Sequence, residues 1–381
     1  MTETEPSNPP LLSATGRPPV HRLALGLPTP SRPPPAHGVR VQPHVPTPLW
    51  REVTGEAAGD VLPSQTAGWR DAVCANGWQD ASRLYTWPDG TRLLVPLVRS
   101  ADESGVTYAS WPEGWGVGGV IAAPGVLTAD RARTVLRDLA ALPAHHVYLR
   151  PATASAPMWE ELMPPGTRRN PRMTQVLDLR GGFDHVWEHR FGQRTRWSVR
   201  RAERAGLSVT QDGTGRLVPE FYRLFELSAV RWAEQSDRAP EETLRRVREK
   251  NPLAKFTAVA RHLGDDCRVW LASYEGQPVA AALALHHGPQ VVYWQAAMDK
   301  AGAARTRAPA YLVYLLVRDA CARGARTLHM GDTYPGTSVT KFKAAFGPEE
   351  HHTAGFWIPG SAGSPESPAD TDATREEGRT I

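Results

Sequence analysis

The segment from residue 308 to residue 347 constrains the fold most strongly. Residues 308–322 are mostly apolar, Pro309 stands at their start and Gly324 follows them, which is the pattern of a buried helix with a glycine stop. Residues 328–332 then predict a short strand, and the sequence FKAAFG at 342–347 follows in a predicted loop. This order predicts an α/β unit in which the helix start faces one ligand, while the strand and loop present polar groups to a second.

Two tails flank a body that is large enough for two domains. Residues 1–46 are dense in proline, and residues 360–381 are rich in Ser, Pro, Asp, Glu and Thr. Such compositions bury too little apolar surface to fold, so we expect both tails to be disordered. The roughly 310 residues between them exceed what one hydrophobic core usually supports. We therefore expect a first domain at 47–180 and a second at 181–359.

The pattern of the body predicts a mixed α/β fold. Asp89-Gly90 lies between two apolar runs and is typical of a hairpin turn, and Thr128 is a candidate helix N-cap. The order of helices and antiparallel strands favours two similar domains in tandem, each with a mostly antiparallel sheet flanked by helices. We expect helices at 66–75, 128–142 and 308–322, a helix-rich run at 183–249, and strands at 82–86, 92–98, 147–150, 175–179, 256–260, 267–274, 278–286, 290–297, 328–332 and 353–358.

Charge and cysteine content narrow the partners and the compartment. The net charge of +4 and the pI near 9.0 permit a phosphate-rich ligand without requiring nucleic acid. The three cysteines are far apart in the sequence, so we expect reduced thiols in the cytoplasm, and neither a disulfide framework nor a metal site. We also expect no secretory signal and no membrane span, because no apolar stretch approaches 18 residues. Nothing in the sequence indicates an oligomeric state.

The segment 191–206, FGQRTRWSVRRAERAG, predicts a basic helix that ends at Gly206. Together with the segment 308–347, it resembles the Fem-type aminoacyltransferases, which carry two GNAT-like halves in one chain. The resemblance implies that this helix meets phosphates of tRNA, of CoA or of a nucleotide-linked acceptor, and we expect Arg194 and Arg201 to make these contacts. A solvated helix face balanced by glutamates is the alternative interpretation.

A glycine and several cations precede the apolar helix, in the segment 300–309. In GNAT enzymes the corresponding turn cradles the CoA pyrophosphate with backbone N–H groups at a helix start. The resemblance therefore implies that Gly302, Arg305 and Arg307 bind the donor, together with Phe342. The complete glycine spacing of GNAT enzymes is absent, which leaves aminoacyl-tRNA as well as acyl-CoA as the donor. A flexible basic loop is the alternative.

Lys343 lies between Phe342 and Phe346, and in the Fem-type family a lysine in this setting lies in the active-site channel. By resemblance, its charge stabilises the developing oxyanion or a donor phosphate. Transfer to an amine also requires a proton acceptor, for which Asp332 is the first candidate and His329 the second. The alternatives are an exposed lysine at a helix start, a turn-forming aspartate and a structural histidine.

In the first half, the segment 110–119 combines a glycine run with two tryptophans. It resembles a segment of Fem-type first domains that helps to line the acceptor groove. The resemblance implies that Trp111 is a flat apolar wall and that Gly118 and Gly119 let the acceptor approach the backbone. A tight turn packed by tryptophan is the alternative.

The resemblance covers about residues 60–358 and predicts an N-acyltransferase that moves an acyl group from acyl-CoA or aminoacyl-tRNA to an amine by direct attack. It implies no bound cofactor, because the donor is a co-substrate, and the acceptor is a small molecule or peptide with a free amine. One alternative is a tRNA-dependent Fem-type enzyme that acts on a cell-wall precursor or peptide. Another is a catalytically idle GNAT-like binding protein.

Overall fold

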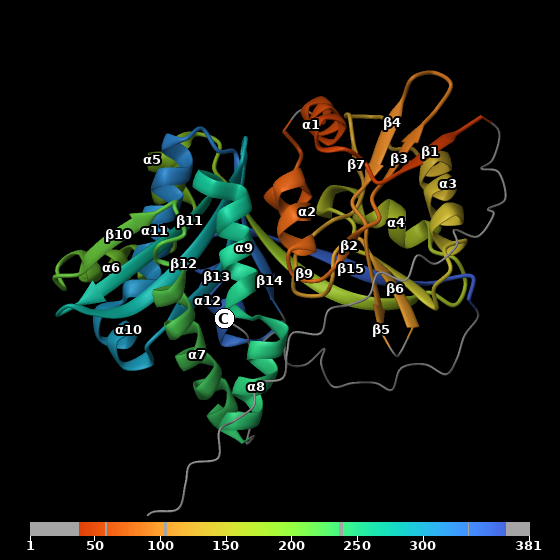
Figure 1. Ribbon diagram of the computed structural model, residues 1–381. Helices are drawn as coiled ribbons and strands as arrows, with labels where there is room; N and C mark the ends of the chain where they lie inside the picture. Colours follow the sequence, from red (N-terminus) through yellow and green to blue (C-terminus); the bar gives the residue numbers. More distant parts are fainter. Residues whose placement is uncertain (1–37, 58, 103–104, 236–238, 334, 363–381) are drawn as a thin grey trace, which may run out of the picture. The chain divides into compact units, whose positions relative to one another are not determined.

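The second half of the protein places an antiparallel meander between groups of helices (Figure 1). The computed structural model describes residues 38–57, 59–102, 105–235, 239–333 and 335–362. The strands of the second half are β10 (Ser208–Asp212), β11 (Cys267–Tyr274), β12 (Gln277–His287), β13 (Gln290–Met298), β14 (Thr327–Thr333) and β15 (Glu349–Pro359). The helices are α5 (Gly182–His189), α6 (Gln193–Glu203), α7 (Val218–Gln235), α8 (Pro240–Lys250), α9 (Leu253–Leu263), α10 (Lys300–Thr306), α11 (Ala308–Ala322) and α12 (Ser338–Ala344).

The first half contains short strands and four α-helices among the described residues. Its predicted hairpin turn and helix cap are confirmed, because β3 pairs with β4 around Gly90 and the side chain of Thr128 accepts a hydrogen bond from the Arg131 N–H. The strands are β1 (Arg40–Pro43), β2 (Gln79–Asp80), β3 (Arg83–Thr86), β4 (Arg92–Val95), β5 (Val98–Asp102), β6 (Gly105–Ala109), β7 (Ile121–Ala122), β8 (His146–Leu149) and β9 (Arg168–Asp178). The helices are α1 (Thr47–Glu56), α2 (Ala67–Cys74), α3 (Ala129–Ala140) and α4 (Ala156–Leu162).

The strand that the sequence predicted at residues 256–260 is wrong, since these residues belong to helix α9. Pro252 precedes this helix, and Phe256, Val259 and Ala260 are buried on it. A spacing of i, i+3 and i+4 places these side chains on one helix face. The run is too short for its aromatic and β-branched residues alone to distinguish a strand from a helix.

The predicted N-terminal tail extends too far along the chain. Residues 40–43 form β1, which pairs with β3, and Val39 and Val45 on either side of it are buried. The Val45 N–H also donates to Ser82 Oγ at 2.9 Å. The surrounding prolines made this segment look like a disordered tail, although it is an edge strand with enough apolar neighbours to pack. The rest of the two predicted tails, residues 1–37 and 363–381, lies outside the described residues.

Strands from both halves share one sheet. In the described chain, eleven strands follow the order β10-β11-β12-β13-β14-β9-β15-β8-β6-β5-β2, and four more form a second sheet in the order β1-β3-β4-β7. The last strand, β15, lies between β9 and β8 of the first half, and β9 also pairs with β14. The mixed α/β fold that the sequence predicted is confirmed, and the domain boundary at residue 180 stays a prediction.

A common hydrophobic core also joins the two halves. Trp69 of α2 lies edge-on to Trp294 of β13, with ring centroids 5.3 Å apart, and edge-on to Trp115 at 5.9 Å. Helices α7 and α9 contribute to this core, whereas α5 and α11 belong to a second core with alternate residues of β12. The meander of the second half is therefore covered on both faces. Among the described helices, none combines the length and apolarity needed to cross a membrane.

Candidate active site

Strands β13 and β14 run parallel and then separate. Their paired residues are 290–292 and 327–329, and both strands continue beyond these pairs. The pairing of β14 with β9 is interrupted between His329 and Asp332, where Gly331 has a φ of +74°. Such a bulge bends a strand, and beyond Val292 and His329 the described residues of β13 and β14 are no longer paired.

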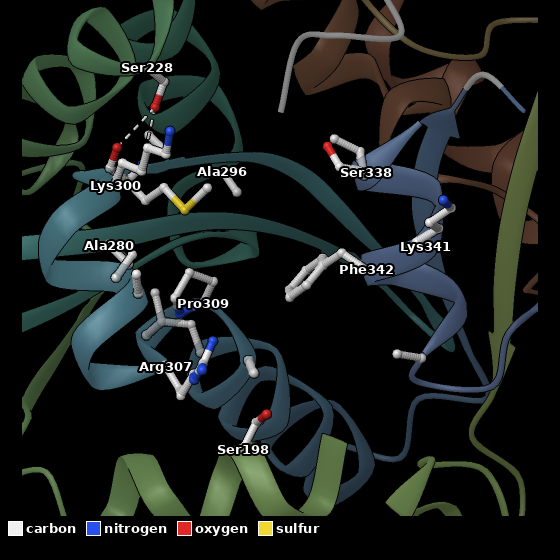
Figure 2. A pocket seen from close by; sticks show the side chains of 18 of the residues that line it. Ser198, Ser228, Ala280, Ala296, Lys300, Arg307, Pro309, Ser338, Lys341 and Phe342 are labelled. Carbon is white, nitrogen blue, oxygen red and sulfur yellow. Dashed lines mark hydrogen bonds between the residues drawn. The ribbon is translucent and has the colours of Figure 1, made fainter. Parts of the chain in front are cut away.

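A cavity of about 530 Å³ lies at this end of the sheet (Figure 2). Its walls come from β12 and β13 and from helices α6, α7, α10, α11 and α12. In Figure 2, Ala280, Ala296, Pro309 and Phe342 border the open space in the middle of the view. The start of α11 therefore faces a chamber, as the sequence order predicted.

Cations surround this chamber. Its basic lining residues are Arg194, Arg231, Lys300, Arg307 and Lys341, and none of the described residues that line it is acidic. Arg307 holds a left-handed conformation directly before α11, and Pro309 lies in the first turn of that helix. The N–H groups of Ala308 and Ala310 already donate to Thr306 and Arg307, so an anion would meet the side-chain cations and the dipole of α11. The arrangement suits a ligand that has negative charges at one end and an apolar part at the other.

An exposed tryptophan on α6, Trp197, lies beside two arginines. It is 48% exposed, and the guanidinium groups of Arg201 and Arg307 lie 5.5 Å and 5.9 Å from its ring centroid. Arg194, on the same helix, lines the cavity, whereas Arg201 lies outside the cavity lining. The structure thus brings one of the two predicted helix arginines to the cavity and places the other against an exposed aromatic ring.

The structure also brings only some of the predicted donor-binding residues to the cavity. Arg307 and Phe342 line the cavity, whereas Gly302 and Arg305 do not. Gly302 lies inside α10, where its N–H donates to Asp299 Oδ2 at 2.7 Å. A Cβ at this position would lie 2.5 Å from Cγ1 of Val279, so the glycine permits close packing of α10 on β12. The segment that the sequence treated as a loop is therefore a capped helix.

Lys343 is fully buried on helix α12, and not on a loop as predicted. Its Nζ donates to the backbone carbonyl of Asp332 at 3.2 Å, beside the bulge of β14. Its neighbours Phe342 and Phe346 line the cavity, and their ring centroids lie 5.3 Å apart. Lys343 itself lies outside the cavity lining, and its role at the oxyanion stays a prediction.

We expect Lys343 to make the protein more stable as the pH rises between about 8 and 10.5. Burial lowers the pKa of Lys343 from 10.5 to about 8, although the nearby Asp332 opposes the shift. In this window the unfolded chain keeps the proton and the folded chain has released it, so raising the pH favours the folded state. Relative to a Lys343→Met variant, the free energy of unfolding should rise by about 2 kcal/mol between pH 7 and pH 9.5. Denaturant titrations at both pH values measure this difference, and a constant or falling difference contradicts the expectation.

Asp332 and His329 both lie on β14, and both have partners. The Asp332 carboxylate accepts hydrogen bonds from the Arg150 guanidinium and from Thr174 Oγ1, the latter at 3.0 Å. Burial, followed by the charge of His351, lowers the pKa of His329 to about 4, so its ring is neutral at neutral pH. Neither residue lines the cavity. The assignment of the proton acceptor therefore stays a prediction.

The tryptophan–glycine segment of the first half is closely packed. Trp111 is fully buried, and its indole N–H donates to the Ser64 carbonyl at 2.7 Å. A Cβ at Gly118 would lie 1.7 Å from the Ser110 carbonyl oxygen, and Gly119 has a φ of +61°. These glycines pack closely against the protein's own backbone, and Trp111 does not present an exposed wall.

Sequence reasoning missed a second buried lysine, Lys255 on α9. It is fully buried, and its Nζ donates to the carbonyl of Gly114 at 2.7 Å and to Asn251 Oδ1 at 2.8 Å. The same ammonium lies 4.8 Å from the centroid of Trp115. Lys255 thus fixes the tryptophan–glycine segment of the first half to the second half. The i, i+4 spacing of Asn251 and Lys255 would have signalled the contact if the helix had been recognised.

Comparisons with known proteins agree with this geometry. Residues 189–343 match the family described as acetyltransferase (GNAT) domain. The solved structure of FemX is similar, with a TM-score of 0.60 and 14% identity over 84% of this chain and 97% of that chain. A conserved protein of unknown function from Bacteroides thetaiotaomicron has a TM-score of 0.54 and 10% identity, over 84% of this chain and 100% of that chain. At these identities the likeness concerns the fold. Comparison with curated proteins gives no match.

Proposed function

Because residues 189–343 form a GNAT acetyltransferase domain in a chain that shares the fold of FemX, we propose that the protein is an N-acyltransferase with an anionic, activated acyl donor. The observation that carries the proposal is the cavity at the start of α11, where cations surround an apolar interior. The cations, together with the dipole of α11, would hold the phosphates of the donor. The apolar interior would hold the part of the donor that bears the acyl group.

In the proposed reaction, the amine of the acceptor attacks the acyl carbon directly. The new N–C bond forms, the thioester or ester bond to the carrier breaks, and the proton released by the amine passes to the leaving group. The cysteines support direct attack, because burial raises the pKa of Cys74 and Cys321 to about 11 and that of Cys267 to about 12. Such thiols are protonated at neutral pH and are poor nucleophiles.

The donor is acyl-CoA or aminoacyl-tRNA, both of which carry phosphates for the basic rim. A cytoplasmic location, where both donors occur, belongs to the proposal.

The test uses the full chain with a set of acyl-CoA thioesters and a set of charged tRNAs. Thermal stabilisation identifies the donor that binds, and mass spectrometry of an amine panel identifies the amide product. If neither donor class stabilises the protein or yields an amide, the acyltransferase proposal is wrong. The alternative of a catalytically idle binding protein then remains.

Removing two cations from the rim is expected to weaken donor binding. Arg194→Gln combined with Arg307→Gln removes two charges that line the cavity and leaves the chamber walls in place. We expect the Kd of the donor to rise at least about tenfold, because hydrogen bonds to charged groups are among the stronger ones. The dependence of log Kd on log salt should also become shallower.

Arg200→Gln is the matched control for this variant. Arg200 is exposed on helix α6, which also carries Arg194, and it lies outside the cavity lining. Its replacement should therefore change the Kd by less than about twofold. Isothermal titration at two salt concentrations measures both variants. Equal weakening by the control would show that the helix acts through its overall charge and not through the cavity.

A further inference from the structure

The interior of the cavity is made of small apolar side chains. Eight of its lining residues are alanines, from two strands, two helices and the residue that follows helix α12. Ala280 of β12 and Ala296 of β13 border the open space together with Pro309 and Phe342 (Figure 2). A larger side chain at either alanine would occupy part of that space. The chamber therefore owes its size to the choice of alanine at these positions.

Two hydroxyl groups in the wall, those of Ser228 and Thr195, are used within the protein. Ser228 Oγ donates to the Leu224 carbonyl and accepts from the Met298 N–H at 3.2 Å. Thr195 Oγ1 donates to the Ala345 carbonyl at 2.7 Å. The alanines offer a polar occupant no side-chain hydrogen bond in exchange for those it loses to water, which is unfavourable. The interior therefore favours an apolar occupant.

The chamber is also large in relation to an acetyl group. An acetyl group has three heavy atoms, and it occupies roughly 90 Å³ if each atom takes the volume of a water molecule in the liquid. The cavity measures about 530 Å³. An acetyl group alone therefore leaves most of the chamber unfilled.

We propose that the acyl group transferred by this protein is apolar and longer than acetyl, and that the alanine-lined interior is its binding site. The inference rests on the proposed acyl transfer and specifies its substrate class. An aliphatic acyl chain on CoA and an apolar amino acid on tRNA share this chemistry. Burial of each methylene group strengthens binding, so affinity should increase with chain length until the chamber is full.

The test measures Kd for two series of donors with the full chain. The first series is acetyl-, butanoyl-, hexanoyl- and octanoyl-CoA, and the second is glycyl-, alanyl- and leucyl-tRNA. In the series that binds, we expect Kd to fall about three- to fourfold for each added methylene. Equal Kd values along that series, or the tightest binding by the shortest acyl group, overturn the inference.

Ala296→Leu narrows the chamber and tests its location. The variant should weaken binding of hexanoyl-CoA, or of leucyl-tRNA, by at least about tenfold, and leave the shortest donor within about twofold. Ala322→Leu adds the same carbons on an exposed part of α11 outside the cavity and should change neither value. Ala280→Leu repeats the test from the neighbouring strand if the first variant does not fold. An equal effect of Ala296→Leu on short and long donors contradicts the assignment.

The two proposals fail in different ways. If the shortest donor binds and reacts as well as the longer ones, the inference is wrong and acyl transfer stands. If no donor of either series binds or reacts, the proposed function is wrong and the inference falls with it.

Discussion

Replacing Lys343 with methionine is expected to lower kcat by about two orders of magnitude. Its ammonium is fully buried beside the point where β13 and β14 separate, next to a phenylalanine that lines the cavity. A charge in such a buried environment is poorly screened, so we expect it to stabilise negative charge that develops in the transition state. Methionine keeps the apolar stem and removes the charge. Steady-state kinetics with the donor that the binding tests identify measure the effect.

Lys341→Met is the matched control, two residues away on the same helix. Lys341 is exposed and lines the cavity, so its loss should raise the KM of the donor and leave kcat within about twofold. Thermal melting of both variants should show only a small change. If Lys343→Met keeps half of the wild-type turnover, the electrostatic role is wrong. If it unfolds the protein, Lys343 serves the structure of β14.

Replacing Asp138 with alanine is expected to destabilise the protein by about 3–5 kcal/mol. The Asp138 carboxylate is buried on α3 and accepts hydrogen bonds from Arg83 Nε and from the Tyr85 hydroxyl, both at 2.6 Å. Arg83 is buried as well, so the variant leaves its guanidinium charge inside the protein without this partner. An unpaired buried charge is among the costliest defects that one substitution can create. Denaturant unfolding followed by circular dichroism measures the loss.

Asp130→Ala provides the comparison on the same helix. Asp130 is 93% exposed in its side chain and pairs with Arg133, so its loss should cost less than about 1 kcal/mol. Similar losses in the two variants would show that helix propensity or the helix dipole, and not the buried ion pair, explains the effect of Asp138→Ala. A loss below about 1 kcal/mol for Asp138→Ala itself would mean that water reaches Arg83 in solution.

The basic helix α6 shows that a run of charged residues does not by itself indicate which of them can bind a ligand. The sequence placed six arginines at 190–204 and offered a ligand site or a solvated face as explanations. In the structure, Arg194 lines the cavity, whereas Arg196 donates three hydrogen bonds to backbone carbonyls of residues 187–191. Both arginines have the same chemistry, and the neighbouring helix decides which of them is free for a ligand.

The glycines likewise show that local sequence does not identify the neighbours of a residue. The sequence predicted that Gly302 and Gly118 bring the backbone close to a ligand. In the structure, the close neighbours of these glycines are Val279 and Ser110 of the protein itself. A missing Cβ indicates close approach in either case, but local sequence does not say what approaches.

The sequence by itself determined the elements whose patterns are local. The hairpin at Asp89-Gly90, the cap at Thr128 and the apolar helix at 308–322 depend on turn chemistry, on one side-chain hydrogen bond and on helical periodicity, all within a few residues. Only the tertiary structure decided that β15 enters the sheet between β9 and β8, that Lys343 is buried outside the cavity lining, and that alanines from β12, β13, α10 and α11 line one chamber. These features depend on contacts between residues far apart in the chain, and such contacts leave no periodicity or spacing in the sequence.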